Sequence, residues 1–131
     1  MIGVDSSVIL YLFLPGEFAP RAENWLKMDC EWASPLLWRS EVRNVLAGHL
    51  RRKQLLFDGM RTIQREPEAL LRGNEHEVDS QRVFKLVRES SRTAYDCEFV
   101  SVVIRLGTKL VTADTKVLKA FPQHTIPFSA A

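Results

Sequence analysis

The sequence is poor in residues that mark disulfide-rich or zinc-binding proteins. Its two cysteines, Cys30 and Cys97, stand in no metal-binding spacing. Nothing in the chain indicates secretion, so we expect both thiols to be reduced and buried in a cytoplasmic protein. Histidine is also scarce: His49, His76 and His124 have no second partner residue nearby in the sequence pattern. The sequence therefore excludes a histidine- or cysteine-based catalytic site.

Long apolar runs are lacking as well. The apolar stretch 8–14 follows Asp5 without a basic leader and stops at Pro15. It is far shorter than the roughly 20 residues that a membrane span needs. We interpret it as a buried first helix, and we expect no signal peptide and no contact with a membrane.

Neither sign of charge dominates the composition. The formal net charge is +2 and the isoelectric point is near 8.7, whereas nucleic-acid-binding domains usually have a clustered basic stripe or an isoelectric point above ~9. The chain has 131 residues, of which 46% are hydrophobic and 26% charged, and no repeats or linkers. These values predict a single globular domain over residues 1–131, whose partners must be inferred from motifs.

Short apolar strands alternate with helices along the chain. This alternation predicts an α/β fold with a central parallel sheet and helices on both faces. We expect strands at 2–4, 31–33, 109–112 and 125–128, and helices at 8–14, 18–28, 35–53, 55–65, 80–90, 94–106 and 117–121. Trp25, Trp32 and Trp38 are expected in the core or at a dimer surface.

Several element boundaries follow from capping residues. Ser34 and Pro35 have the order of an N-cap and a first helical residue, which predicts the start of the third helix. Pro67 predicts a break after the fourth helix, and segment 67–78 has no legible pattern. Asp79 can cap a fifth helix that buries three side chains, those of Val83, Phe84 and Val87.

Residues 93–116 are the most informative stretch. Thr93 is a plausible N-cap and Gly107 a plausible stop for a helix whose first turn contains Asp96. The β-branched run that follows predicts a buried strand reaching the surface at Asp114. A helix followed at once by a strand doubles back, so both carboxylates are expected at the carboxyl end of the sheet, where open α/β folds place their sites.

Two further carboxylates belong to the same edge. Asp5 ends the first strand, and Glu41 lies inside the apolar stripe of the third helix, where an unpaired charge is costly. Each acid has a structural alternative: Asp5 and Asp114 as N-caps, Asp96 as a first-turn acid, and Glu41 in an ion pair with a residue such as Arg105. Their convergence favours a common site.

A cluster of carboxylates predicts a site for a hard divalent cation. Crowded carboxylates raise one another's pKa unless a cation lies between them, and oxygen ligands with open positions suit Mg²⁺ or Mn²⁺. We expect Asp5, Asp96 and Asp114 to bind the metal, with Glu41 as a fourth catalytic carboxylate. The chemistry indicated is hydrolysis of a phosphodiester by a metal-activated water, with Ser6 and Thr112 as orienting hydroxyls.

The only locally basic stretch ends the third helix. Arg43, Arg51 and Arg52, followed by Lys53, are candidates for contacts with the phosphates of a nucleic-acid substrate. The alternative is that they form a solvated helix end.

These motifs together resemble one family. The start Asp5-Ser6-Ser7, Glu41 in the helix after Ser34-Pro35, and the segments 95–100 and 110–114 are similar to those of PIN domains, specifically the VapC-type toxin ribonucleases. The resemblance covers essentially the whole chain. Cys97 stands where the family often has another small residue.

The resemblance implies a Mg²⁺- or Mn²⁺-dependent endoribonuclease that acts on RNA, forms a homodimer and is blocked by a cognate antitoxin. The family's acidic positions fall on Asp5, Glu41, Asp96 and Asp114, with Thr112 as a neighbouring hydroxyl. Two alternatives stay open: an inactive PIN-like module that binds RNA or protein, and a receiver-type phospho-acceptor domain. A receiver would need an acidic pair after the first strand and a lysine at the end of the last one.

Overall fold

The centre of the molecule is an all-parallel sheet, seen in a computed structural model that describes residues 1–131. Its order is β3-β2-β1-β4-β5. In the register, Gly3 of β1 lies between Ala33 of β2 and Leu110 of β4. The predicted parallel sheet is confirmed, and its strands are β1 Ile2–Val4, β2 Trp32–Pro35, β3 Glu75–His76, β4 Leu110–Thr112 and β5 Thr125–Pro127.

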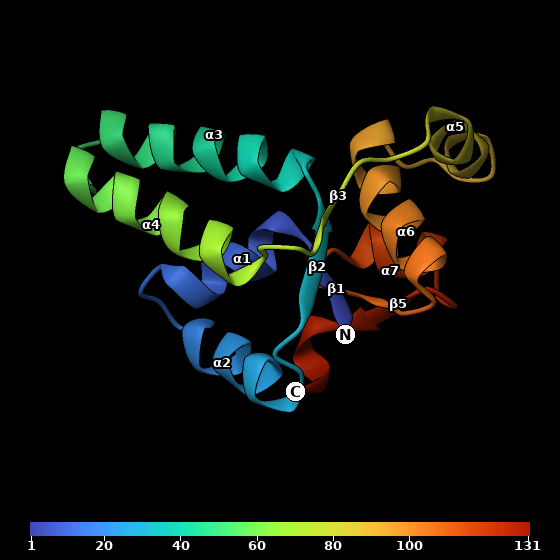
Figure 1. Cartoon of the computed structure of the whole chain (residues 1–131), viewed down its shortest axis with the longest axis horizontal. Coiled ribbons are helices and arrows are strands. Elements are labelled where there is room, and N and C mark those ends of the chain that lie inside the picture. Colours follow the sequence, from blue (N-terminus) through green and yellow to red (C-terminus); the bar gives the residue numbers. More distant parts are fainter.

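Helices cover both faces of the sheet, as predicted. Figure 1 shows the helices α1 to α4 on one side and the helices α5 and α6 on the other. A short 3₁₀ helix, η1, ends the chain and contacts α2. The bounds are α1 Ser6–Phe13, α2 Ala19–Met28, α3 Leu37–Arg51, α4 Phe57–Leu70, α5 Ser80–Arg88, α6 Ala94–Leu106, α7 Thr115–Ala120 and η1 Phe128–Ala130.

The core lies between these helices and the sheet. All three tryptophans are buried in it, and the Trp25 indole donates a 2.9 Å hydrogen bond to the carbonyl of Phe128. Gly3 marks the closest approach between α6 and β1, because a Cβ atom there would lie 2.1 Å from Cγ1 of Val103. Only glycine permits this packing distance.

The start of the third helix was wrongly predicted. Ser34 and Pro35 belong to β2, and α3 begins at Leu37 without a side-chain cap. The Ser34 hydroxyl is buried and donates to the carbonyl of Val4. It thereby joins β2 to β1, so it is not available to cap a helix. At the first helix, the structural alternative for Asp5 is correct, because Asp5 caps α1.

The fourth helix also runs further than predicted, because α4 continues through Pro67 to Leu70. A proline inside a helix removes one backbone hydrogen bond. The Pro67 ring is buried. The helical turn after Pro67 still forms, because the Leu71 amide donates to the Pro67 carbonyl at 2.9 Å. Burial and the rest of the ladder offset the lost bond.

Two predictions of buried side chains, those of Phe84 and Cys30, are wrong. Phe84 is 65% exposed, and Leu86 takes the inward position on α5. Cys30 is exposed, whereas Cys97 is buried as expected. None of the helices combines the length and the apolar character needed to cross a membrane.

Candidate active site

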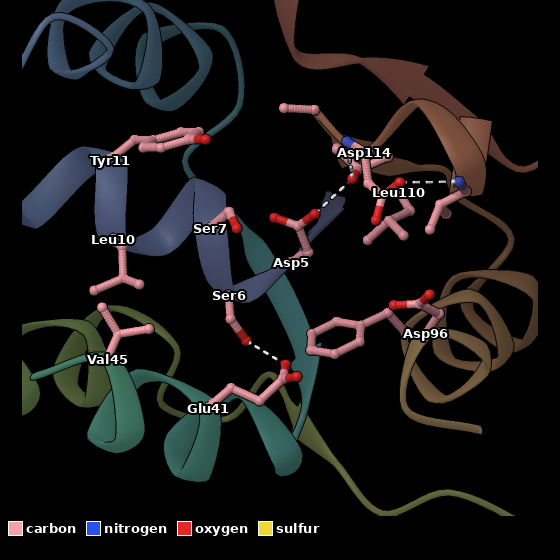
Figure 2. Close-up of a pocket in the computed structure, with 14 residues that line it drawn as sticks. Asp5, Ser6, Ser7, Leu10, Tyr11, Glu41, Val45, Asp96, Leu110 and Asp114 are labelled. Atoms are coloured by element: carbon pink, nitrogen blue, oxygen red, sulfur yellow. Dashed lines mark hydrogen bonds between the residues drawn. The ribbon is translucent and has the colours of Figure 1, made fainter. Parts of the chain in front are cut away.

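The acidic pocket lies at the carboxyl ends of β1 and β4. The chain leaves β1 toward β2 on one side, and β4 adds on the other side, so this is the point where the strand order reverses. Open α/β sheets form their ligand crevices at such a point. The cavity, of about 410 Å³, is lined by all four acids of the sequence analysis, Asp5, Glu41, Asp96 and Asp114 (Figure 2).

Asp5 is fixed by hydrogen bonds to both carboxylate oxygens. Its Oδ1 accepts the Val8 amide at 2.9 Å, which caps α1, and its Oδ2 accepts the Thr112 hydroxyl at 2.5 Å. Burial raises the pKa of Asp5 to about 6, although these two hydrogen bonds lower it; Glu41 and Asp114 add smaller repulsions. Asp5 is therefore both a helix cap and a destabilised charge in the pocket.

Thr112 connects the two strand ends. Its hydroxyl donates to Asp5 and accepts the backbone amide of Asp114 at 3.0 Å. Asp114 in turn caps α7, because its Oδ1 accepts the amides of Lys116 and Val117 at 2.9 and 3.4 Å. The capping alternatives for Asp5 and Asp114 are thus correct, and they coexist with a place in the pocket.

Glu41 reaches the pocket from α3. Its Oε1 accepts the Ser6 hydroxyl at 2.7 Å, and no hydrogen bond from the protein reaches Oε2. It has no ion pair, so the alternative of a structural pair with Arg105 is wrong. Ser6 therefore orients Glu41.

Asp96 enters from the first turn of α6. The Thr93 hydroxyl accepts the Asp96 backbone amide at 3.1 Å, so the predicted cap is confirmed and leaves the carboxylate free of that role. Burial and the nearby Asp114 raise the pKa of Asp96. Arg92, a residue not predicted from the sequence, opposes this shift and lies with its Nη1 3.5 Å from Oδ2 of Asp96. The i,i+4 spacing of Arg92 and Asp96 is the sequence feature that could have predicted this ion pair.

The donor set fits a hard divalent cation that keeps part of its water shell. No three of the Asp, Glu, His and Cys side chains close on one point as a metal cluster. Mg²⁺, however, typically takes one or two carboxylates and several waters, and the cavity offers four carboxylates with room for such waters. The raised pKa values of Asp5 and Asp96 are what unneutralised, partly buried carboxylates would have.

The predicted basic residues lie outside this pocket. Arg43 and Arg51 are exposed on α3, and Arg52 is exposed directly after it. Arg43 lines a second cavity between α3 and α4. Arg39, nearby on the same helix, has a structural role: it pairs with Glu75 at 2.6 Å and Glu68 at 2.9 Å. His49 contacts Gln54, and no histidine lines the acidic pocket.

The all-parallel sheet with carboxylates at its switch point places the protein among open α/β proteins with an acidic ligand site. Comparisons with known proteins identify the family. A PIN domain family model matches residues 2–122. The chain therefore belongs to the PIN domain family, and the receiver-type alternative is excluded.

Similar proteins carry toxin and ribonuclease names. Ribonuclease VapC3 of Pyrobaculum aerophilum is 28% identical over 127 residues, covering 95% of this chain and 97% of the relative. FitAcB from Neisseria gonorrhoeae has a TM-score of 0.76 at 16% identity, over 100% of both chains. A toxin-antitoxin complex from Klebsiella pneumoniae has a TM-score of 0.66 at 18% identity, over 96% of both chains. These structures establish the same fold.

Proposed function

We propose that this PIN domain is a Mg²⁺- or Mn²⁺-dependent endoribonuclease, the toxin of a toxin-antitoxin pair. The observation that carries the proposal is the convergence of Asp5, Glu41, Asp96 and Asp114 on one cavity at the switch point of the sheet. The name of the relative Ribonuclease VapC3 supports RNA as the substrate.

In the proposed mechanism, Asp5, Asp96 and Asp114 would hold the ion, directly or through its waters. When bound, the ion would supply a water of lowered pKa and offset charge on the scissile phosphate. Thr112 keeps Asp5 in place through its 2.5 Å hydrogen bond. Ser6 holds one oxygen of Glu41, so that the other is free to accept a proton from a water in the pocket. Arg92 holds the Asp96 carboxylate at 3.5 Å.

We also propose that a protein partner covers the pocket. In addition, we propose that the chain forms a homodimer and acts in the cytoplasm. The toxin-antitoxin complex among the structural neighbours supports the partner. Leu56 and Phe57, at the start of α4, are 82% and 59% exposed, and exposed apolar side chains of this size support a protein-protein contact. Light scattering of the isolated chain and of the chain mixed with a neighbouring-gene product tests both.

The catalytic proposal is tested with a structured RNA. We expect cleavage with Mg²⁺ or Mn²⁺ and none with excess chelator, and Asp96→Asn should lose it because one ligand is removed. Products should have a 5′-phosphate, since the nucleophile is water and not a ribose hydroxyl. Undiminished cutting in chelator, or a 2′,3′-cyclic phosphate end, would contradict the mechanism. Binding of RNA without any cleavage would instead favour the inactive module.

A further inference from the structure

One wall of the acidic pocket consists of hydroxyl groups on α1 that no residue of the protein uses. The pocket lining contains four side chains that can donate a hydrogen bond, those of Ser6, Ser7, Tyr11 and Thr112, and no lysine or arginine. Ser6 donates to Glu41 and Thr112 donates to Asp5. Ser7 and Tyr11 are left with hydroxyls that make no hydrogen bond within the protein.

Helix geometry places these two hydroxyls together. Ser7 and Tyr11 are four residues apart on α1, so they lie on one face, one turn from each other. Figure 2 shows the Tyr11 hydroxyl directed toward the side of the cavity where Ser7 and Asp114 lie. Both donors therefore face the space between the acids.

The Tyr11 ring is held rigidly from outside the pocket. Its centroid lies 4.8 Å from that of Phe18 and 5.1 Å from that of Phe128, in tilted arrangements. Tilted aromatic pairs of this kind are favourable beyond their buried area. Phe128 is fixed in turn, because its carbonyl accepts the Trp25 indole. The hydroxyl thus has a defined position without any hydrogen bond of its own.

The hydroxyl also remains a donor at neutral pH. Burial, and then the charge of Asp5, raise the pKa of Tyr11 above its ordinary value of 10. A pocket rich in carboxylate acceptors and without lysine or arginine can receive an anionic backbone only through a bound cation and neutral donors. Unpaired hydroxyls beside the acids can serve as these neutral donors.

We propose that Tyr11, assisted by Ser7, binds the substrate strand by donating hydrogen bonds to sugar-phosphate oxygens at the cleavage site. This inference rests on the proposed ribonuclease function and assigns the contact to α1. Tyr11 is a substrate-binding residue here, and it takes no part in holding the metal.

The test compares Tyr11→Phe, which keeps the ring and removes only the hydroxyl, with the wild type. We expect KM for RNA to rise about three- to tenfold, the loss of one hydrogen bond, while kcat changes less than twofold. The midpoint of thermal unfolding, and its increase with Mg²⁺, should stay as in the wild type. Ser7→Ala should have a smaller effect in the same direction.

The other tyrosine provides the matched control. Tyr95 is 61% exposed and does not line the pocket, so Tyr95→Phe should leave KM unchanged. An unchanged KM in Tyr11→Phe, or an equal rise in Tyr95→Phe, would overturn the inference while the wild type still cleaves RNA. A wild type that cleaves no RNA with metal would instead overturn the proposed function.

A modified substrate identifies the oxygen that is bound. With a 2′-deoxy substitution at the cleaved nucleotide, the difference in KM between Tyr11→Phe and wild type should vanish if the ribose hydroxyl is the acceptor. It should persist if the acceptor is a phosphate oxygen. An equally large difference in the Kd of RNA strands that lack the cleavage site would overturn a contact at that site.

Discussion

At the scale of the residue, Asp5 performs two tasks whose energies oppose each other. As the N-cap of α1 it accepts a backbone amide, which typically stabilises a helix by ~1 kcal/mol. As a pocket acid it is half-buried near two other carboxylates, and its pKa rises to about 6. The fold thus accepts an unfavourable charge at a position where a cation can neutralise it.

The raised pKa of Asp5 predicts how stability depends on pH without metal. The folded carboxyl ionises near pH 6, above the ordinary value of 3.8, so the folded state binds more protons between these values and stability falls as pH rises through this window. Above pH 6 the free energy of unfolding is lowered by at most about 3 kcal/mol. Asp5→Asn should therefore unfold at higher temperature than wild type at pH 7.5 in chelator, with the advantage shrinking as pH falls from 6 to 4.

Thermal unfolding monitored by circular dichroism from pH 3.5 to 7.5 measures this difference. Asp58→Asn is the control, since the Asp58 side chain is 93% exposed and its loss should leave the pH profile unchanged. With Mg²⁺ at pH 7.5 the order should reverse, because an ion that binds only the folded wild type raises its stability by mass action. A stability difference between Asp5→Asn and wild type that does not grow from pH 4 to 6 in chelator would refute the account.

At the scale of the element, α6 sets the position of Asp96 and depends on its contact with β1. Gly3 allows Val103 to approach the strand, and the N-terminal turn of α6 then brings Asp96 to the sheet's carboxyl edge. Gly107, with φ of 68°, ends the helix in the left-handed conformation and turns the chain directly into β4. Packing at one end of the helix thus determines the geometry of the site at the other.

Gly3→Ala should disturb this arrangement. The added methyl would lie 2.1 Å from a side-chain carbon of Val103, so α6 or Val103 must move. Overpacking of this kind costs typically 1–3 kcal/mol, measurable by urea unfolding, and cleavage should fall because Asp96 moves with the helix. Gly16→Ala is the control, since no atom lies within 4 Å of its added Cβ, and it should change neither quantity. Equal stabilities of the two variants would disprove the role of Gly3.

The elements were predictable where one local signal dominated. Thr93, Gly107, Asp79 and Asp114 cap or end helices as their residue types indicate. Prediction failed where tertiary contacts decide: Ser34 has the sequence of a cap but bonds to β1, and Pro67 is tolerated because it is buried. The four acids were predictable because strand ends converge, whereas the free hydroxyl of Tyr11 required side-chain contacts that no spacing reveals.

At the scale of the whole molecule, charge is distributed unevenly around the pocket. The charged side chains of the lining are all carboxylates, whereas Arg51, Arg52 and Lys53 are exposed at the far end of α3. Ten residues of helix separate Glu41 from Arg51, a distance of about 15 Å. If the protein cleaves RNA as proposed, we expect a strand with one phosphate at the acids to extend along α3 to this basic end, which would supply the attraction that the pocket itself lacks.

Replacing Arg51 and Arg52 by alanine tests this path. We expect weaker RNA binding and a smaller salt dependence, with the slope of log K against log salt reduced by about 1.4 for two lost phosphate contacts on a single strand. Binding is measured by fluorescence anisotropy at several salt concentrations. The increase in melting temperature with Mg²⁺ should not change, because neither arginine lines the pocket.

The control for this pair removes the same charge elsewhere. Lys85 and Arg88 are exposed on α5, on the opposite side of the sheet from α3 (Figure 1), so their replacement by alanine lowers the net charge equally without touching the proposed path. If the basic end of α3 contacts phosphates, only the first pair reduces the slope. If both pairs reduce it equally, attraction depends on net charge alone, and if neither does, Arg51 and Arg52 are the solvated helix end that the sequence left as the alternative.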